Sequence, residues 1–568
     1  MQSGSHKKVL LALLPFWTPF IPPIGIACLK TQMKNLQCEV KLADLTVESI
    51  FEKIYYRYFD VLADNIPENR RGNFYSIGHD VLRNHMIAHL NYEKEREFID
   101  LIRTLILKTF YMDIPDNQIL RLIQVIDEFF TRLEQLFFEI IEKEQPDVLG
   151  LSVYSDTLPA SMFIFEKTRK RYPHIKTVMG GGVFADLLAP GSENLEIFLE
   201  KTQKYIDHLI VGEGEILFQK LLRAELPQSN RVYTLKDIDG ETLDLNAADL
   251  VDYSGLDVGK YLYMASYTSR SCPFQCSFCS ETIQWGKYRR KEAKQIVREL
   301  RMLHRQYGFQ LFLLSDSLLN PVIEELADAL SPNGDPLYWQ GWLRVDNHVS
   351  NLAFTNSLRA SGFYHARMGI ESGSQEVLDL MGKRITTGQI MSSLSSLALS
   401  GIKTTTLWVI GHPGETDDDF RQTLDMIEKF SEDIYEAECR PFYYYEQGQV
   451  GSPQWGERVK KQPLYPGKFQ DMLLFQNWVL DCEPSRQVTY ERVNRFVNRC
   501  KELGIPNPYS LKDIYQADVR WTKLHKNAVP PLLEFTTGDN VVEELKDFKN
   551  VNTPAAKENL AGSINFQF

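Results

Sequence analysis

The feature that most constrains the fold is an alternation of short apolar runs with helical segments, which occurs in two series along the 568 residues. Alternation of this kind is typical of a parallel sheet that is covered by helices on both faces. In the first series, over residues 7–225, we expect strands at 9–14, 39–42, 147–153, 177–179 and 209–211. The sequence therefore predicts an α/β protein that begins with a doubly wound parallel sheet.

A long segment, residues 46–143, interrupts this first series. Its clearest part lies between Ile119 and Ile141, where apolar residues recur with helical spacing. The stripe consists of Leu122, Val125, Ile126, Phe129, Leu133, Leu136, Phe137 and Ile140. A stripe of this kind is more often core than a binding surface, so we expect a helical insertion that packs against the sheet.

The second series follows residues 226–259, which are polar and acidic and are interpreted as a linker. Strands are expected at 263–269, 311–314, 339–345, 365–370, 403–410 and 438–444. Six such units are typical of a partial (β/α)6 barrel over residues 260–455, with functional groups at the carboxyl ends of its strands. Residues 456–568 are interpreted as a helix-rich C-terminal region that caps the barrel mouth.

Composition excludes several classes of protein. The formal net charge is −12, whereas binding nucleic acid usually requires a basic surplus. No apolar run approaches the ~20 residues of a membrane span, and residues 1–6 lack the pattern of a signal peptide. Eight cysteines are too few for a disulfide scaffold. We therefore expect a cytoplasmic protein that does not act in a membrane, with action on nucleic acid as a minority interpretation.

Three of the cysteines, Cys272, Cys276 and Cys279, lie on one predicted loop with the spacing C-x3-C-x2-C. Three thiolates spaced in this way can bind three irons of a [4Fe–4S] cluster, which leaves the fourth iron open to another ligand. Clusters held by four cysteines have other spacings. Zinc is the alternative, but it requires a fourth protein ligand that no neighbouring residue supplies.

This loop resembles the signature of radical S-adenosylmethionine (SAM) enzymes. In that family the open iron binds the amino and carboxylate groups of SAM, and reduction of the cluster produces a 5′-deoxyadenosyl radical. The resemblance implies that SAM contacts one aromatic residue of the loop and residues at the ends of the following strands. These are Phe278, Ser315, Asp316, Arg344, Glu371, Ser372, Ile410 and Gly411. The sequence departs from the family at 315–317, where the common Gly-Gly-Glu form is absent.

The doubly wound, Rossmann-like domain in front of such a barrel resembles the cobalamin-dependent class of this family. The resemblance implies a cobalamin site at the turns after its strands. The site would comprise Pro23, Gly25, Ser152, Val153, Tyr154, Ser155, Gly180, Gly181, Gly182, Val183, Gly212, Glu213 and Gly214. Because no Asp-x-His-x-x-Gly motif occurs, cobalamin would bind without a histidine on cobalt. Loop 15–20 would lie beneath the cobalt, with Trp17 as the candidate neighbour. The alternative is a degenerate sheet that binds no cofactor.

The resemblance implies a methyltransferase that acts on an unactivated carbon or phosphorus of a small metabolite or peptide. One SAM would methylate the cobalamin, and a second would produce the radical that activates the substrate, with electrons from a flavodoxin or ferredoxin. Tyr445 and Glu446, near the last expected strand, are candidates to face the substrate. The alternatives are a rearrangement, cyclisation or ring contraction without methyl transfer, tRNA modification, and a non-enzymatic cobalamin-binding protein.

Overall fold

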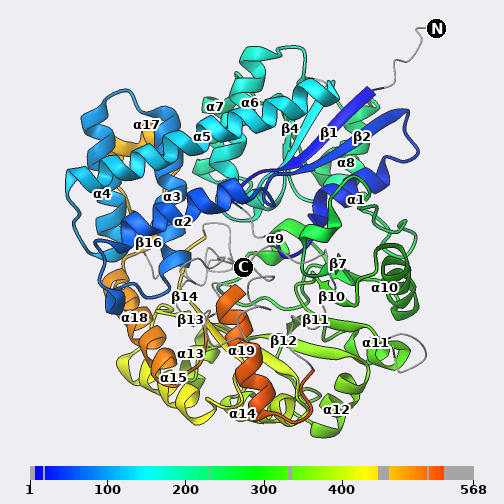
Figure 1. Ribbon diagram of the computed structural model, residues 1–568, viewed down its shortest axis with the longest axis vertical. Coiled ribbons are helices and arrows are strands. Elements are labelled where there is room, and N and C mark those ends of the chain that lie inside the picture. Colours follow the sequence, from blue (N-terminus) through cyan, green and yellow to red (C-terminus); the bar gives the residue numbers. More distant parts are fainter. Residues whose placement is uncertain are drawn as a thin grey trace, which may run out of the picture.

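The computed structural model describes residues 7–16, 19–227, 229–330, 336–445, 460–507 and 511–529. It contains two parallel sheets of six strands each, one above the other along the longest axis (Figure 1). Helices cover the sheets, so both apolar strand series are buried. No helix among the described residues is long and apolar enough to cross a membrane.

The first sheet has the strand order β2-β1-β3-β4-β5-β6. Its strands are β1 Lys7–Leu13, β2 Cys38–Asp44, β3 Val148–Ser152, β4 Lys176–Gly180, β5 His208–Ile210 and β6 Val232–Tyr233. The chain moves outward from β1 to β2 and then returns to β3 on the other side of β1. Sheets with this order bind ligands at the carboxyl ends of the strands where the order reverses. The strand β6 lies in the segment that we expected to be a linker, and its pairing with β5 completes the sheet.

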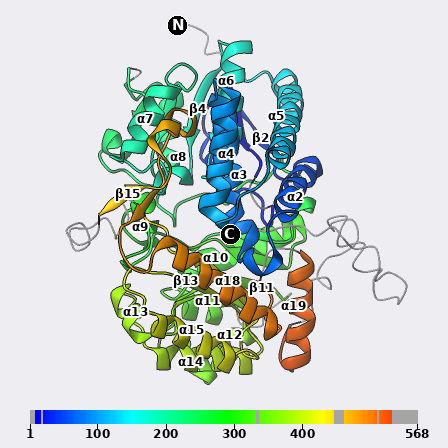
Figure 2. The same cartoon turned by 90° about the vertical axis from the view of Figure 1, so that its left-hand side faces the viewer.

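Four long helices form the insertion, which lies beside the first sheet (Figure 2). They are α2 Ser49–Ala63, α3 Phe74–Asn91, α4 Glu95–Phe110 and α5 Asp116–Glu144. The stripe predicted for α5 is confirmed as core: Leu122, Phe129 and Phe137 are fully buried, and Leu136 packs partly buried against the same cluster. The insertion also contacts the short helix α17 Gln470–Leu473 of the C-terminal region.

The second sheet has the strand order β7-β10-β11-β12-β13-β14, as the six expected strands predicted. These strands are β7 Met264–Ser266, β10 Leu311–Leu314, β11 Tyr338–Leu343, β12 Phe363–Glu371, β13 Lys403–Ile410 and β14 Glu436–Pro441. Because every neighbouring pair is parallel, all six carboxyl ends lie at one edge. The main helices are α10 Ala293–Tyr307, α11 Ile323–Leu330, α12 Leu352–Ala360, α14 Thr387–Leu399 and α15 Asp417–Lys429.

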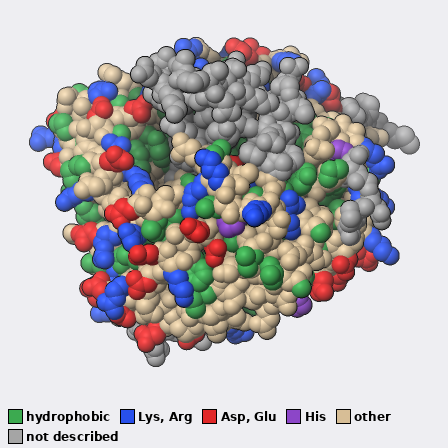
Figure 3. All heavy atoms as spheres, turned by 60° about the horizontal axis from the view of Figure 1, so that its bottom comes forward, with side chains coloured by type: hydrophobic (Ala, Val, Ile, Leu, Met, Phe, Trp, Pro, Cys, Tyr) green, Lys and Arg blue, Asp and Glu red, His purple; other side chains and the backbone are tan. Residues whose placement is uncertain are grey.

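Two small antiparallel ribbons complete the fold. The hairpin β8 Ser269–Arg270 with β9 Arg289–Arg290 encloses the cysteine loop and helix α9 Glu281–Trp285. The ribbon β15 Lys461–Pro463 with β16 Trp478–Leu480 belongs to the C-terminal region, together with helices α18 Arg486–Glu502 and α19 Leu511–Leu524. Helix α18 packs against β13 and β14. The lower face of the molecule mixes basic with acidic side chains (Figure 3).

Candidate active site

The cysteine loop follows directly after β8. Cys276 is buried, whereas Cys272 and Cys279 are half-buried. Burial raises the pKa of the Cys272 thiol and raises that of Cys279 to about 12. Among the described residues, no three Cys, His, Asp or Glu side chains converge on one point as the ligands of a single metal ion would. Three thiolates that each bind a different iron of a cubane do not need to converge in this way.

Residues beyond the ends of two neighbouring strands contact this loop. After β11, the Arg344 guanidinium donates to the Cys276 sulfur at 3.7 Å and lies 4.0 Å from the centre of the Phe274 ring. After β12, Lys383 lies 5.7 Å from the centre of the Phe278 ring. These contacts place the carboxyl edge of the second sheet against the cysteine loop.

Two residues in this group were missed by the sequence analysis as ligand candidates. Lys383 forms an ion pair of 2.6 Å with Glu371, and both side chains are buried. His412, after β13, lies with its Nε2 3.3 Å from the Ser277 hydroxyl, and burial lowers its pKa to about 4. Lys383 stands in no motif, so only the fold brings it to the loop, whereas His412 directly follows the predicted residues Ile410 and Gly411.

The residues around the loop can accommodate the polar end of SAM. The Nη2 atom of Arg344 and the hydroxyl of Ser315 are buried and have no hydrogen-bond partner among the described residues. A buried polar group without a partner is costly. A carboxylate or amino group bound here would remove that cost, so both residues fit their predicted role.

Other predicted SAM residues already have protein partners. The buried carboxylate of Asp316 accepts hydrogen bonds from the backbone N–H groups of Thr268 and Ser269, and burial raises its pKa to about 6. The Ser372 hydroxyl accepts from the backbone N–H of Ser374 at 3.1 Å. A Cβ atom on Gly411, which directly follows Ile410, would lie only 2.1 Å from the Thr489 hydroxyl. The contacts of these residues with SAM therefore stay predictions.

The turns after β3 and β4 in the first sheet interlock. The backbone N–H of Val153 donates to the carbonyl of Gly180 at 2.7 Å, and that of Val183 donates to the carbonyl of Val153 at 3.1 Å. Between them Gly181 has a φ of 117°, and a Cβ there would lie 2.5 Å from the Val153 oxygen. Only glycine fits this position.

Other predicted cobalamin residues meet where the strand order reverses. Pro23 precedes α1 Ile24–Gln32. A Cβ on Gly25 would lie 3.7 Å from the hydroxyl of Ser152, the last residue of β3. Gly182 begins a short 3-10 helix that contacts α9, next to the cysteine loop. The first sheet thus directs its ligand-binding edge toward the loop; Trp17 lies outside the described residues.

The turn after β5 has a different role. Glu213 is paired with Arg270 at 2.9 Å and with Arg289, and it accepts from the backbone N–H of Leu243. Arg270 also pairs with Glu215, near the start of α8 Gly214–Leu222. Although burial alone would raise the pKa of Glu213, the two arginines lower it. We call these four residues the ionic junction, because they join the Gly212 turn to the hairpin that carries the cysteine loop.

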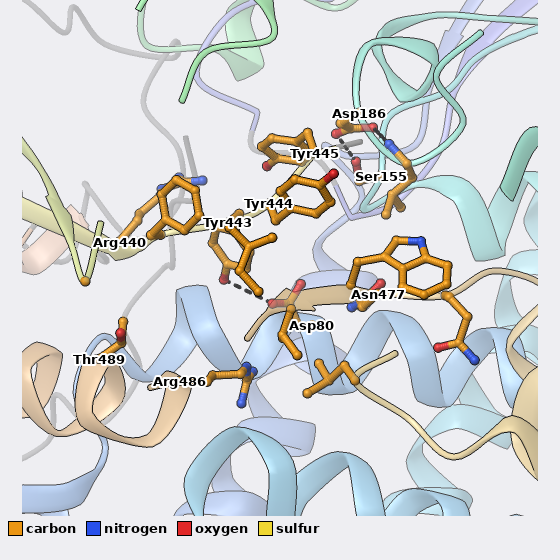
Figure 4. A pocket seen from close by; sticks show the side chains of 18 of the residues that line it. Asp80, Ser155, Asp186, Arg440, Tyr443, Tyr444, Tyr445, Asn477, Arg486 and Thr489 are labelled. Atoms are coloured by element: carbon orange, nitrogen blue, oxygen red, sulfur yellow. Dashed lines mark hydrogen bonds between the residues drawn. The ribbon is translucent and has the colours of Figure 1, made fainter. Parts of the chain in front are cut away.

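A cavity of about 370 Å³ lies next to this region (Figure 4). Several parts of the chain line it. Among them are the turns after β3 and β4 with Tyr154, Ser155 and Asp186; the ends of β13 and β14 with Gly411 and Tyr443–Tyr445; α3 with His79, Asp80 and Arg83; β16 with its preceding residues; and α18 with Arg486 and Thr489. Tyr445 therefore lines the cavity as expected of a substrate-facing residue, whereas Glu446 lies outside the described residues.

Charged groups in the cavity are balanced and partly paired. Asp80 forms an ion pair of 2.9 Å with Arg83 and accepts a hydrogen bond of 3.0 Å from the Tyr443 hydroxyl. Asp186 accepts from the Ser155 hydroxyl, and burial raises its pKa to about 6. Sequence reasoning missed the residues of α3, because the polar side of an insertion helix carries no motif and only its apolar stripe has a period.

The comparisons with known proteins agree with this geometry. Residues 266–427 match the model of the radical SAM superfamily, so this part of the chain is a radical SAM domain. The uncharacterized methyltransferase PH0819 of Pyrococcus horikoshii is 24% identical over 369 residues, which are 60% of this chain and 73% of that protein. The anaerobic magnesium-protoporphyrin IX monomethyl ester cyclase of Rubrivivax gelatinosus is 24% identical over 324 residues; the match covers 52% of this chain and only 56% of the cyclase.

A solved structure resembles nearly the whole chain. It is the radical SAM methyltransferase TsrM from Kitasatospora setae, with a TM-score of 0.61 and 15% identity, and the match covers 96% of this chain and 100% of TsrM. At this identity the likeness concerns the fold. TsrM has been solved with cobalamin and a [4Fe–4S] cluster, and with tryptophan and a SAM analogue.

Proposed function

We propose that this protein is a cobalamin-dependent radical SAM methyltransferase that acts on an unactivated carbon or phosphorus. The observation that carries the proposal is the composition of the cavity wall. Tyr154 and Ser155 come from the ligand-binding edge of the first sheet, and Gly411 and Tyr445 come from the carboxyl edge of the second. A substrate in the cavity would therefore lie next to the cofactor-binding edges of both sheets.

Each cofactor has a distinct set of residues. Cys272, Cys276 and Cys279 would hold the cluster, and the unpartnered atoms of Ser315 and Arg344 would hold the polar end of SAM. When bound, the cluster and SAM would supply a hydrogen-abstracting radical, and the cobalamin would supply a carrier for the methyl group. We propose a flavodoxin or ferredoxin as the electron donor.

The protein itself would position and shield the substrate. Aromatic side chains, among them Tyr443, Tyr444 and Tyr445, form much of the cavity wall and would limit the access of water once a substrate is bound (Figure 4). Exclusion of water protects a reactive radical from side reactions. Fixed contacts with the wall would hold the acceptor atom in line with the methyl donor, which lowers the entropic part of the barrier.

The proposal can be tested without the substrate by slow uncoupled turnover of SAM. Iron-reconstituted, cobalamin-loaded protein should release both S-adenosylhomocysteine and 5′-deoxyadenosine under reducing, anaerobic conditions. Protein without cobalamin should release only 5′-deoxyadenosine. The Cys276→Ala variant should release no 5′-deoxyadenosine. Release of 5′-deoxyadenosine alone by the loaded protein would instead favour a rearrangement or cyclisation without methyl transfer.

A spectroscopic test concerns the cobalamin site directly. The turns at 152–155, 180–183 and 212–214 contain no histidine. The Co(II) form of the loaded protein should therefore give an EPR spectrum without nitrogen superhyperfine splitting. Clear splitting would contradict the assignment, and a failure to bind cobalamin would favour a degenerate first sheet.

A further inference from the structure

Among the described residues, the small ribbon β15–β16 pairs with no third strand. Across the ribbon, the backbone N–H of Leu464 donates to the carbonyl of Asn477, and that of Asp481 donates to the carbonyl of Lys460, both at 2.7 Å. In this register Gln462 lies opposite Val479. Antiparallel pairs alternate between bonded and non-bonded, so Gln462 and Val479 are the bonded pair.

The backbone groups of the two flanking residues in β16 therefore point away from β15. These are the N–H and C=O groups of Trp478 and of Leu480. No hydrogen bond from another described element reaches them. The edge of β16 thus offers two donors and two acceptors at alternate residues.

This unpaired edge borders the cavity. Five consecutive residues, from Gln476 to Leu480, line the cavity. Side chains of a strand alternate between its two faces, so a consecutive run along a cavity means that the edge of the strand, rather than one face, borders the space. The opposite strand β15 is exposed and lies at the periphery of the molecule (Figure 2).

Side-chain atoms beside the edge also lack partners. The Gln476 and Asn477 amide oxygens and the Trp478 indole N–H are buried without a hydrogen-bond partner among the described residues. The Nε of Arg83, whose side chain is 8% exposed on the facing helix α3, lacks one as well. Two buried acceptors and two buried donors without partners thus lie among the residues that line the cavity, which also include Tyr444 and Tyr445 (Figure 4).

We propose that the substrate is a peptide that enters the cavity in extended form and pairs with β16 as a third strand. Strand addition of this kind takes its affinity from main-chain hydrogen bonds and its specificity from pockets for alternate side chains. Donor and acceptor pairs two residues apart match an extended backbone, whereas a small metabolite reaches only one pair. The proposal rests on the proposed function and names its substrate class.

The cavity volume limits how much of a peptide can lie inside it. About 370 Å³ lies at the small end of ligand sites. It accepts the residue to be modified and its neighbours but not a folded domain. The modified side chain would lie against Tyr444 and Tyr445, and the rest of the peptide would extend along the ribbon.

The first test uses synthetic peptides as probes. Cofactor-loaded protein is incubated with a mixture of random heptapeptides and, separately, with the free amino acids from its complete hydrolysis; bound species are identified by mass spectrometry. Heptapeptides should be retained. For a retained peptide, N-methylation of alternate backbone amides should weaken binding about tenfold, whereas N-methylation of the intervening amides should have little effect. Retention of no peptide, equal retention of free amino acids, or an equal effect at every amide would overturn the proposal.

A matched pair of variants tests the protein side. Leu480→Pro removes an N–H group that faces the cavity, and Lys461→Pro removes an N–H group at the solvent edge of the same ribbon. Both residues belong to non-bonded pairs, so neither change removes a ribbon hydrogen bond. Leu480→Pro should weaken peptide binding about tenfold relative to Leu480→Ala, and Lys461→Pro should leave it unchanged. Equal binding by all three variants would overturn the proposal. Binding is measured without turnover, so failure here is distinct from failure to methylate.

Discussion

The ionic junction and the neighbouring cavity differ in how they treat buried polar groups. In the junction, Glu213, Glu215 and Arg270 are almost fully buried and every charged group has an opposite partner. In the cavity, buried atoms of Gln476 and Trp478 have no partner among the described residues. Both regions lie beside the carboxyl edges of the two sheets. The depth of burial therefore does not explain why polar groups are paired in one region and unpaired in the other.

This contrast separates a fixed joint from a binding site. A buried charge is tolerated only with a partner, so the junction holds its four residues in one arrangement. An unpaired buried polar atom costs free energy in the empty protein, and a ligand that pairs with it recovers that cost. The junction therefore sets the position of the cysteine loop against the first sheet, whereas the cavity is complementary to something that binds.

The largest expected effect is at the junction. Arg270→Met leaves Glu215 and part of Glu213 buried without a partner, so it should lower the free energy of unfolding by about 3–5 kcal/mol. Urea denaturation measures the loss. The double variant Arg270→Met, Glu215→Met should recover part of it, because Glu213 retains Arg289. A loss below about 1 kcal/mol for Arg270→Met would mean that the junction is not a fixed joint.

A smaller effect is expected at the interlocked turn beside it. Gly181 has φ 117° and ψ −173°, a conformation almost restricted to glycine, and a Cβ would meet the Val153 backbone. Gly181→Ala should cost roughly 3 kcal/mol, from backbone strain and overpacking together. Gly308→Ala is the matched control: φ is also positive, 77°, but a Cβ meets nothing within 4 Å, so the cost should be about 1–2 kcal/mol. Equal costs for the two variants would contradict the close fit of the turn.

The two regions should also respond to pH with opposite sign. Burial raises the pKa of Asp186 from 3.8 to about 6, so the folded protein binds this proton more tightly than the unfolded chain. Its contribution to stability is therefore complete below about pH 4 and is lost as the pH rises to about 6, by about 1–2 kcal/mol for this partly exposed carboxyl. The pKa of Glu213 is lowered, so its contribution is present above about pH 4.5 and is lost on acidification.

Unfolding measured at several pH values tests these signs. Asp186→Asn keeps an oxygen that can accept from Ser155 and should abolish the loss of stability between pH 4 and 6. Glu213→Gln should cost most at neutral pH, and its cost should shrink below pH 4.5. Parallel pH profiles for Asp186→Asn and the original protein would refute a raised pKa at Asp186.

The smallest effect is expected at Asn477, whose buried amide oxygen has no hydrogen-bond partner among the described residues. Asn477→Leu removes the unpartnered amide oxygen and leaves the backbone hydrogen bond to Leu464 in place. The free energy of unfolding, measured by urea denaturation, should therefore change by no more than about 0.5 kcal/mol. A loss above 1.5 kcal/mol would show that this side chain stabilises the fold and is not kept for a ligand.

The sequence determined the elements that depend on local spacing. Strands with continuous apolar runs and the helical stripe of α5 are encoded by periods of a few residues, so all six strands of the second sheet were predicted. The C-x3-C-x2-C spacing likewise identified the cysteine loop, because its three cysteines lie within eight residues. The two-residue strand β6 was missed, since pairing with β5 rather than its own pattern makes it a strand.

Tertiary structure alone decided how these parts meet. The Tyr443 hydroxyl reaches Asp80 across 363 positions of sequence, and Glu213, whose contact with cobalamin stays a prediction, pairs with Arg270 beside the cysteine loop. Such contacts have no period and no spacing, because they arise when helices and sheets bury their apolar faces against each other and bring polar groups from distant segments together. The cavity owes its walls to several separate parts of the chain for the same reason.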